Sequence, residues 1–193
     1  MGRNCCREDW VLAAAARLNS GAPAASIQAL AADLKVTEGS FYHHFKGRAE
    51  LYRAVAAWRA GPDAARQLAA ELDGILGPAE RLRRMHAVWQ RSARLDAALR
   101  QMAGEDPEIA AAVLAADEAA ARAVTAAFTE LGFRRRDARL RALMLISLSR
   151  AQHAGMVPAA ATDFNEAIGL LAAPRIPARA AARAAARGTA RAL

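Results

Sequence analysis

Apolar side chains recur along this chain at intervals of three and four residues, which is the spacing of one face of an α-helix. Such a stripe over residues 11–18 predicts a first helix, capped by Asn4 and ended by the turn around Gly21. No run of alternating apolar and polar residues, which would indicate a strand, interrupts the pattern. We therefore expect an all-α fold.

Two short helices are expected next. Ser26 caps the first of them, and its buried stripe consists of Ile27, Leu30, Ala31 and Leu34. The hydroxyl of Thr37 caps the second, which runs from Glu38 to about His44 with Phe41 and Phe45 as its apolar pair. A short helix, a tight turn and a second short helix form a helix-turn-helix, whose second helix fits the major groove of DNA.

Prolines, glycines and N-cap residues mark the starts and ends of the remaining predicted helices. A longer helix starts at about Arg48 and is broken by Gly61 and Pro62, where we place a domain boundary. Further helices open at Pro62, Pro78 and Pro107, the last of them capped by Asp106 and ended by Gly132. Asp137 is expected to cap the next, and Thr162 or Asp163 the final one, which runs to about Ala172. We thus predict a DNA-binding domain over residues 1–60, a dimerisation and effector domain over 61–173, and a tail over 174–193.

Composition narrows the class of protein. The chain has 193 residues, of which 54% are hydrophobic, and no stretch of eighteen uncharged apolar residues, so we expect no membrane span. The first ten residues lack the apolar run of a signal peptide. The only cysteines, Cys5 and Cys6, are adjacent, which suits neither a disulfide framework nor a zinc site. The simplest expectation is a protein of the reducing cytoplasm.

Positive charge is concentrated at the two ends of the chain. The formal net charge is +8, and residues 174–193 contain arginine at every fourth position and no acidic residue. Such ends suggest a polyanionic partner, although charged runs are more often a solvated surface, and an arginine-rich composition alone also explains the tail. Like charges four residues apart oppose a helix, so we expect the unbound tail to be disordered.

The segment VTEGSFYHHFKGRAEL resembles the signature of the tetracycline-repressor-like (TetR) family of bacterial transcription regulators. Tyr42, His44, Phe45, Arg48 and Leu51 stand in the family's register, and the resemblance extends over residues 7–60. Three positions depart from the pattern. Lys35 stands where the family has glycine in the turn, so that either Lys35 adopts a left-handed conformation at a cost of roughly 1 kcal/mol or the turn differs. Arg48 replaces a lysine, and Leu18 replaces a phenylalanine.

The resemblance implies a set of DNA contacts. Ser26 and Gln28 would approach one phosphate strand, while the other would be gripped by Thr37, Ser40, Tyr42, His44, Lys46 and Arg48. Base reading would fall to Glu38, Gly39 and His43.

Some of these residues have alternative roles. The alternative for Glu38 is a carboxylate that only complements the helix dipole, and the less favoured alternative for Tyr42 is a core aromatic. His43 and His44 diverge by about 100° on a helix, so we expect no metal site.

The second domain is expected to pair with its own copy and to hold an effector. An apolar interface is predicted from Leu140, Leu143, Met144, Leu148, Ala151, Phe164, Ile168 and Leu171, unless these residues are buried within one subunit. Met85, Trp89, Met102, Phe128, Met144 and His153 are candidates to line a cavity for a small apolar effector, with ordinary core packing as the alternative. The cavity itself is implied by the family resemblance.

No sequence pattern of an enzyme stands out. The chain has no Gly-rich phosphate loop, GxSxG, HExxH or CxxC, and we expect neither catalysis nor a cofactor. The favoured function is a homodimeric, cytoplasmic repressor that an effector releases from a palindromic DNA operator. The alternative is a helical interaction or structural protein that has lost sequence-specific DNA reading.

Overall fold

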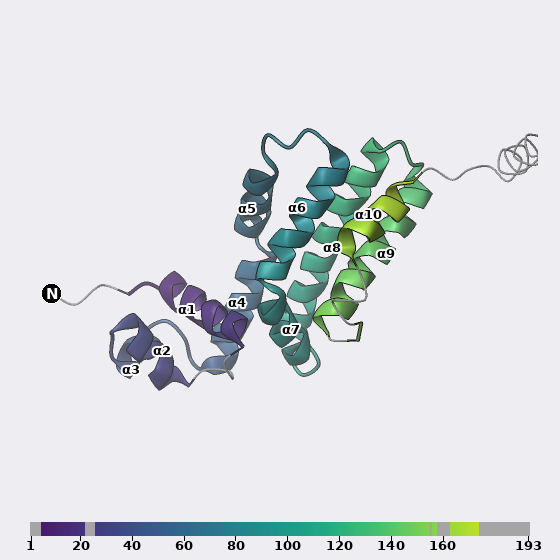
Figure 1. Cartoon of the computed structure of the whole chain (residues 1–193). Coiled ribbons are helices and arrows are strands. Elements are labelled where there is room, and N and C mark those ends of the chain that lie inside the picture. Colours follow the sequence, from purple (N-terminus) through teal and green to yellow (C-terminus); the bar gives the residue numbers. More distant parts are fainter. Residues whose placement is uncertain (1–4, 22–25, 155, 158–162, 174–193) are drawn as a thin grey trace, which may run out of the picture.

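The structure of the chain is a computed structural model that describes residues 5–21, 26–154, 156–157 and 163–173 (Figure 1). The described residues form helices joined by turns and loops, with no strand among them, so the all-α prediction is confirmed. In Figure 1, α2 and α3 lie at one end of the molecule and α9 and α10 at the other. Asn4, Thr162 and the basic tail of residues 174–193 lie outside the described part of the chain.

The first four helices are α1 (Arg7–Ser20), α2 (Ile27–Leu34), α3 (Glu38–Tyr42) and α4 (Arg48–Ala60). Helix α1 begins after its N-cap residue Cys6, so the predicted cap Asn4 was wrong, and the Cys6 backbone N–H donates to the Asp9 carboxylate over 2.8 Å. It ends at Gly21, whose φ of 80° is a left-handed conformation that suits glycine. Ser26 caps α2 as predicted, since its hydroxyl accepts from the Ala29 N–H over 3.1 Å.

Six helices follow: α5 (Pro62–Leu72), α6 (Pro78–Arg91), α7 (Ala93–Met102), α8 (Pro107–Glu130), α9 (Arg135–His153) and α10 (Phe164–Ala172). Proline occupies the first position of α5, α6 and α8, where its missing N–H costs nothing. The carboxylates of Asp106 and Asp163 cap α8 and α10.

Three further predicted boundaries were wrong. One helix was predicted to start at Pro78, but residues 78–102 form two helices, because the chain turns at Ser92. No glycine or proline stands at this turn to indicate it in the sequence. Helix α9 has Arg134 as its N-cap residue, and Asp137 lies inside its first turn. Helix α3 ends at Tyr42, before the predicted His44, because the His44 and Phe45 N–H groups both donate to the Phe41 carbonyl in a closing turn.

Two apolar clusters form the core. One joins the buried faces of α1, α2, α3 and α4 to Leu95, Leu99 and Ile109 of α7 and α8. The other lies between α6, α8, α9 and α10, around Phe128 and Ile168. The first cluster therefore crosses the boundary predicted at Gly61, whose two-domain division stays a prediction.

Within the part of the chain that the structure describes, no helix is long and apolar enough to cross a membrane.

Candidate nucleic-acid interface

The turn between α2 and α3 depends on Lys35. Its φ of 57° and ψ of 43° lie in the left-handed region, which resolves the two alternatives left by the missing glycine. The Lys35 N–H donates to the Ala32 carbonyl over 3.2 Å, and the Val36 N–H donates to the Ala31 carbonyl over 3.0 Å. The tight turn is thus kept, at a conformational cost of roughly 1 kcal/mol.

Aromatic side chains hold α3 from behind. Phe41 and Phe45 are buried and stack with their ring centroids 5.4 Å apart. Trp10 of α1 meets Phe41 edge to face, with a centroid distance of 5.3 Å. Such pairs add about 0.5 to 1.5 kcal/mol each to the free energy gained from burial. Helix α3 is therefore fixed on the core by one face and presents the other to solvent.

The predicted DNA contacts lie along α2, α3, the following loop and the first residue of α4. Nine of them are exposed: Ser26, Gln28, Thr37, Glu38, Gly39, Tyr42, His43, Lys46 and Arg48. Ser40 and His44 are half-buried. Tyr42 is 61% exposed, which excludes the alternative of a core aromatic.

Two of these residues are engaged differently from the prediction. Thr37 occupies the N-cap position of α3, but its side chain makes no capping hydrogen bond. His44 lies with Nε2 3.0 Å from the Cys5 carbonyl oxygen, so this nitrogen donates to the backbone that leads into α1. His44 therefore connects α3 to the N-terminal segment, and only its other ring nitrogen is left to meet a phosphate.

The acidic residues near this face are largely neutralised by partners. Asp33 pairs with Arg17, and that hydrogen bond lowers the pKa of the carboxyl group. Glu50 accepts from the Lys46 N–H over 2.8 Å, which lowers its pKa, and lies 3.4 Å from Arg7. Carboxylates paired in this way repel a phosphate backbone less, which leaves Glu38 as the acidic side chain of this face without an ion pair among the described residues. Among the described residues, no group of three or more His, Cys, Asp or Glu side chains could hold a metal ion.

A large cavity lies between α4, α5, α6, α7, α8 and α9. Its volume is about 1610 Å³, and of the six predicted effector residues only Trp89 and His153 line it. The other four do not line it. Met85 and Phe128 are buried in the second apolar cluster, and Met102 packs against the first. Met144 is 54% exposed. Helical spacing placed these side chains on a face, but it does not distinguish a cavity wall from close-packed core.

The cavity wall also carries charges that the sequence reasoning missed. Arg59 pairs with Asp96 at 2.8 Å, and Asp117 pairs with both Arg100 and Arg150 at 2.5 Å. These partners come from α4, α7, α8 and α9. No local spacing links them, so the sequence pattern carries no signal for the cluster.

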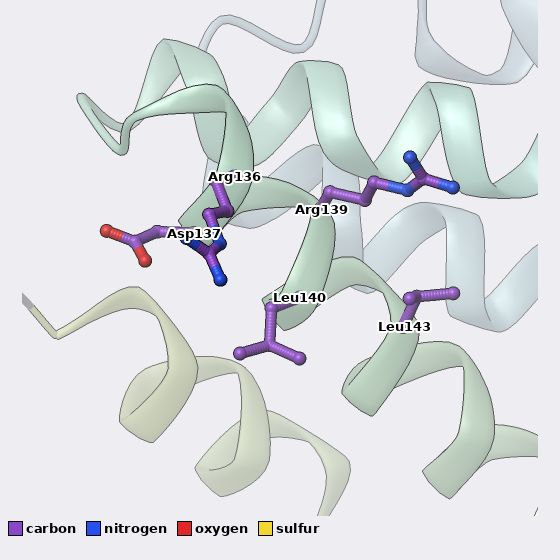
Figure 2. Close-up of a pocket in the computed structure, with 5 residues that line it drawn as sticks. All are labelled: Arg136, Asp137, Arg139, Leu140 and Leu143. Atoms are coloured by element: carbon purple, nitrogen blue, oxygen red, sulfur yellow. The ribbon is translucent and has the colours of Figure 1, made fainter.

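The outer face of α9 is apolar. Leu140, Leu143 and Met144 are each about half exposed, and Leu170 of α10 is 70% exposed. Figure 2 shows Leu140 and Leu143 beside Arg136, Asp137 and Arg139 along the first half of α9, where they line a shallow groove.

The predicted interface set needs a correction. Phe164 and Ile168 are buried within the subunit, and Leu148, Ala151 and Leu171 are half-buried, because α10 packs its apolar stripe against α6 and α9. The apolar surface left for a partner is therefore smaller than the sequence suggested.

Comparison with known proteins bears on this arrangement. Residues 11–55, which run from α1 into α4, match the family described as bacterial regulatory proteins, tetR family. No curated protein matches the chain. A transcriptional regulator from Rhodococcus sp. Rha1 has the same fold, with a TM-score of 0.67 and 18% identity over 87% of this chain and 94% of that one.

Two further solved structures share the fold. A TetR-family regulator from Agrobacterium tumefaciens gives a TM-score of 0.64 at 18% identity, over 86% of this chain and 93% of that one. AibR, solved in complex with isovaleryl coenzyme A and operator DNA, gives 0.55 at 19% identity, over 86% and 95%. The match at residues 11–55 and the shared fold together confirm the resemblance of these N-terminal helices to the TetR family of bacterial regulatory proteins.

Proposed function

We propose that this protein is a DNA-binding transcriptional regulator, that it works as a homodimer, and that it acts as a repressor released from a palindromic operator by an effector in the cavity. The observation that carries the proposal is the exposed face of α3, held outward by the buried Phe41 and Phe45. A helix mounted in this way can enter a major groove without unfolding any neighbouring element.

The contacts assigned to DNA follow from chemistry and exposure. Hydroxyl, imidazole and cationic groups suit phosphate oxygens, and these groups lie around the ends of α2 and α3. Glu38 at the start of α3 and His43 just after its end are exposed and carry the base reading, since a carboxylate accepts from the amino group of cytosine. Gly39 lies between the base-reading and phosphate-binding residues and lets the DNA approach closely.

A dimer is proposed because one short recognition helix covers too few base pairs for specificity. Two copies related by a twofold axis would read two half-sites one or more helical turns apart. The exposed side chains of Leu140, Leu143 and Met144 support this proposal, because they offer an apolar surface for a second copy. Helix α9, which carries these residues, lies at the opposite end of the molecule from α3 (Figure 1).

Regulation is proposed to act through the cavity. A ligand in the cavity that stabilises one arrangement of helices α4 to α9 would change the distance between the α3 helices of the two subunits. AibR, which has this fold, was solved with both a coenzyme A thioester and operator DNA, and this supports a regulator that responds to a ligand. The proposal assigns no catalysis to the chain.

The test is selection of bound duplexes from a random-sequence pool by the full chain, followed by salt titration of the enriched duplex. We expect a palindrome, and an affinity that falls steeply as salt rises. Arg48→Ala should weaken all duplexes about equally, whereas Glu38→Ala should change the preferred base at one position per half-site. Arg122→Ala, on the exposed side of α8, is the matched control and should change neither.

The alternative function predicts a different result. A helical interaction protein would enrich no sequence and would bind no duplex even at low salt. Equal effects of Arg48→Ala and Glu38→Ala on every duplex would also contradict the assignment of base reading to α3.

A further inference from the structure

The cavity contains more positive than negative charge where α4, α7, α8 and α9 meet. Arg59 forms two hydrogen bonds with Asp96, from Nε over 2.8 Å and from Nη2 over 3.0 Å. Asp117 is shared, since Arg100 donates to both of its oxygens and Arg150 lies 2.5 Å from one of them. Three arginines thus face two aspartates among the described residues.

The surrounding wall does not remove this excess. Two more arginines, Arg84 and Arg91, reach the same cavity and share Glu71, and Asp73 is the remaining acidic residue of the lining. The five arginines therefore outnumber the four carboxylates over the whole lining. Guanidinium groups stay protonated in proteins, so the surplus charge remains, and only an anion can compensate for its partial removal from water.

The imidazole of His153 lies near these arginines, and one of its nitrogen atoms has no hydrogen-bond partner among the described residues. His153 follows Arg150 by three residues on α9 and also lines the cavity. Its Nε2 atom is buried and has no hydrogen-bond partner within the described part of the chain. Burial also lowers the pKa of His153, which favours the neutral ring. A neutral imidazole nitrogen left in this position is a hydrogen-bonding group suited to the head of a ligand.

The rest of the lining is apolar. Trp58, Trp89, Leu68, Val113 and Ile146 contribute to it, together with many alanines. Ligand sites commonly measure about 300 to 1,000 Å³, so a cavity of about 1610 Å³ accommodates an extended molecule with room for a polar head. The lining thus combines a broad apolar wall with one cationic and hydrogen-bonding corner.

We propose that this cavity binds an amphipathic organic anion, with an acyl body against the tryptophans and an anionic head at Arg100, Arg150 and His153. The anionic head balances the positive charge of Arg100 and Arg150 that the single Asp117 carboxylate leaves over. A planar carboxylate or a phosphate can accept two parallel hydrogen bonds from a guanidinium group. This replaces the purely apolar effector expected from the sequence. Naming the ligand an effector rests on the proposed function, whereas its binding to the cavity does not.

The experiment is isothermal titration calorimetry of the full chain, without DNA, against three probes of equal chain length. These are decanoate, decanoyl coenzyme A and decan-1-ol. At least one of the two anions should bind ten times more tightly than the alcohol, and the better of them distinguishes a free acid from a thioester. An alcohol that binds as tightly as both anions, or the absence of binding by all three, would overturn the proposal.

Substitutions locate the head group. Arg150→Gln should weaken the preferred anion at least tenfold and leave the alcohol unchanged, while Arg122→Gln, an exposed arginine on α8, should change neither. Arg100→Gln is the second variant, to be used if Arg150→Gln loses its helical circular dichroism. Unchanged anion affinity in a folded variant of either arginine would refute the assignment. Because these titrations need no operator, a failure of DNA binding and a failure of ligand binding are told apart.

Discussion

The side-chain amide of Asn19 donates from Nδ2 to the backbone carbonyl of Arg91 over 2.6 Å. Its Oδ1 accepts from the Leu95 N–H over 3.3 Å. One side chain at the end of α1 thus satisfies the last carbonyl of α6 and an early N–H of α7, groups that a helix leaves unpaired. The Arg94 guanidinium adds a bond to the Ser20 carbonyl over 2.9 Å, so the break at Ser92 is tied to the DNA-binding end of the chain.

Replacing this amide should destabilise the protein. Asn19→Ala leaves two backbone groups without partners, and we expect the free energy of unfolding to fall by about 1 to 2 kcal/mol. Urea denaturation followed by circular dichroism measures the change. Asn165→Ala is the control, because that side chain is exposed in the first turn of α10 and only its backbone N–H is used. Equal losses in the two variants would contradict the role of Asn19.

Relief of the left-handed turn should stabilise the protein. Lys35→Gly removes the steric cost of the positive φ, which we expect to raise the free energy of unfolding by up to about 1 kcal/mol. Lys35→Ala is the matched control, since it removes the same charge but keeps the Cβ atom. If both variants shift the urea midpoint alike, the effect belongs to charge and the strain is absent.

A substitution at Gly39 should change DNA affinity without lowering the free energy of unfolding. A Cβ atom added there would meet only the Thr37 hydroxyl oxygen, at an ordinary contact distance of 3.7 Å, so Gly39→Ala should fold at least as stably as the wild type. We expect it to bind the selected duplex roughly tenfold more weakly, because the methyl group occupies the space of the approaching groove. Gly169→Ala on α10, also without close neighbours, should leave DNA affinity unchanged. Full affinity of Gly39→Ala would show that DNA does not come close at this point.

Sequence spacing predicted most of the helices and the exposed face of α3. Prolines at residues 62, 78 and 107 marked helix starts, and the register of Phe41 and Phe45 correctly identified the buried side of α3. Both signals are local, since a fixed φ angle or a missing N–H acts within one turn of helix.

The features that were missed depend on contacts between distant segments. The break at Ser92 is stabilised by Asn19 and by Arg59, which donates to the Ser92 hydroxyl over 3.0 Å. Phe164 and Ile168 face inward because α10 packs against α6, which helical spacing alone does not decide. The shared Asp117 likewise brings together residues that lie far apart along the chain.

The apolar face of α9 provides a test of the dimer. Leu143→Glu places a charge in the centre of the exposed patch, and we expect it to raise the dimer dissociation constant at least a hundredfold. Analytical ultracentrifugation over a range of concentrations measures the change. Leu76→Glu is the control, since that leucine is 93% exposed in the loop between α5 and α6. A wild-type chain that sediments as a monomer, or a Leu143→Glu variant that remains dimeric, would contradict the interface.

His86 should make the stability depend on pH. Burial lowers its pKa to about 4, with a smaller contribution from His153, and its ring stacks on Phe164 with a centroid distance of 3.4 Å. Below pH 6.5 the unfolded chain takes up a proton at this ring that the folded chain does not, so the free energy of unfolding should fall between pH 6.5 and 4. The ring is only half buried, so we expect a loss of roughly 1 kcal/mol from pH 7 to 5.

The matching variant is His86→Phe, which keeps the stacking on Phe164 and removes the titrating group. Its free energy of unfolding should change less between pH 7 and 5 than that of the wild type, as measured by urea denaturation at the two pH values. Identical pH slopes would show that another group is responsible.

The first apolar cluster is completed by Leu95, Leu99 and Ile109, which come from helices beyond the boundary at Gly61. A fragment cut at that boundary would expose to water the apolar surfaces of α1 and α4 that α7 and α8 now cover. We therefore expect the segment of residues 1–60 to be less stable as a separate fragment than within the full chain. Grafting it onto another protein would require carrying α7 and the start of α8 along with it.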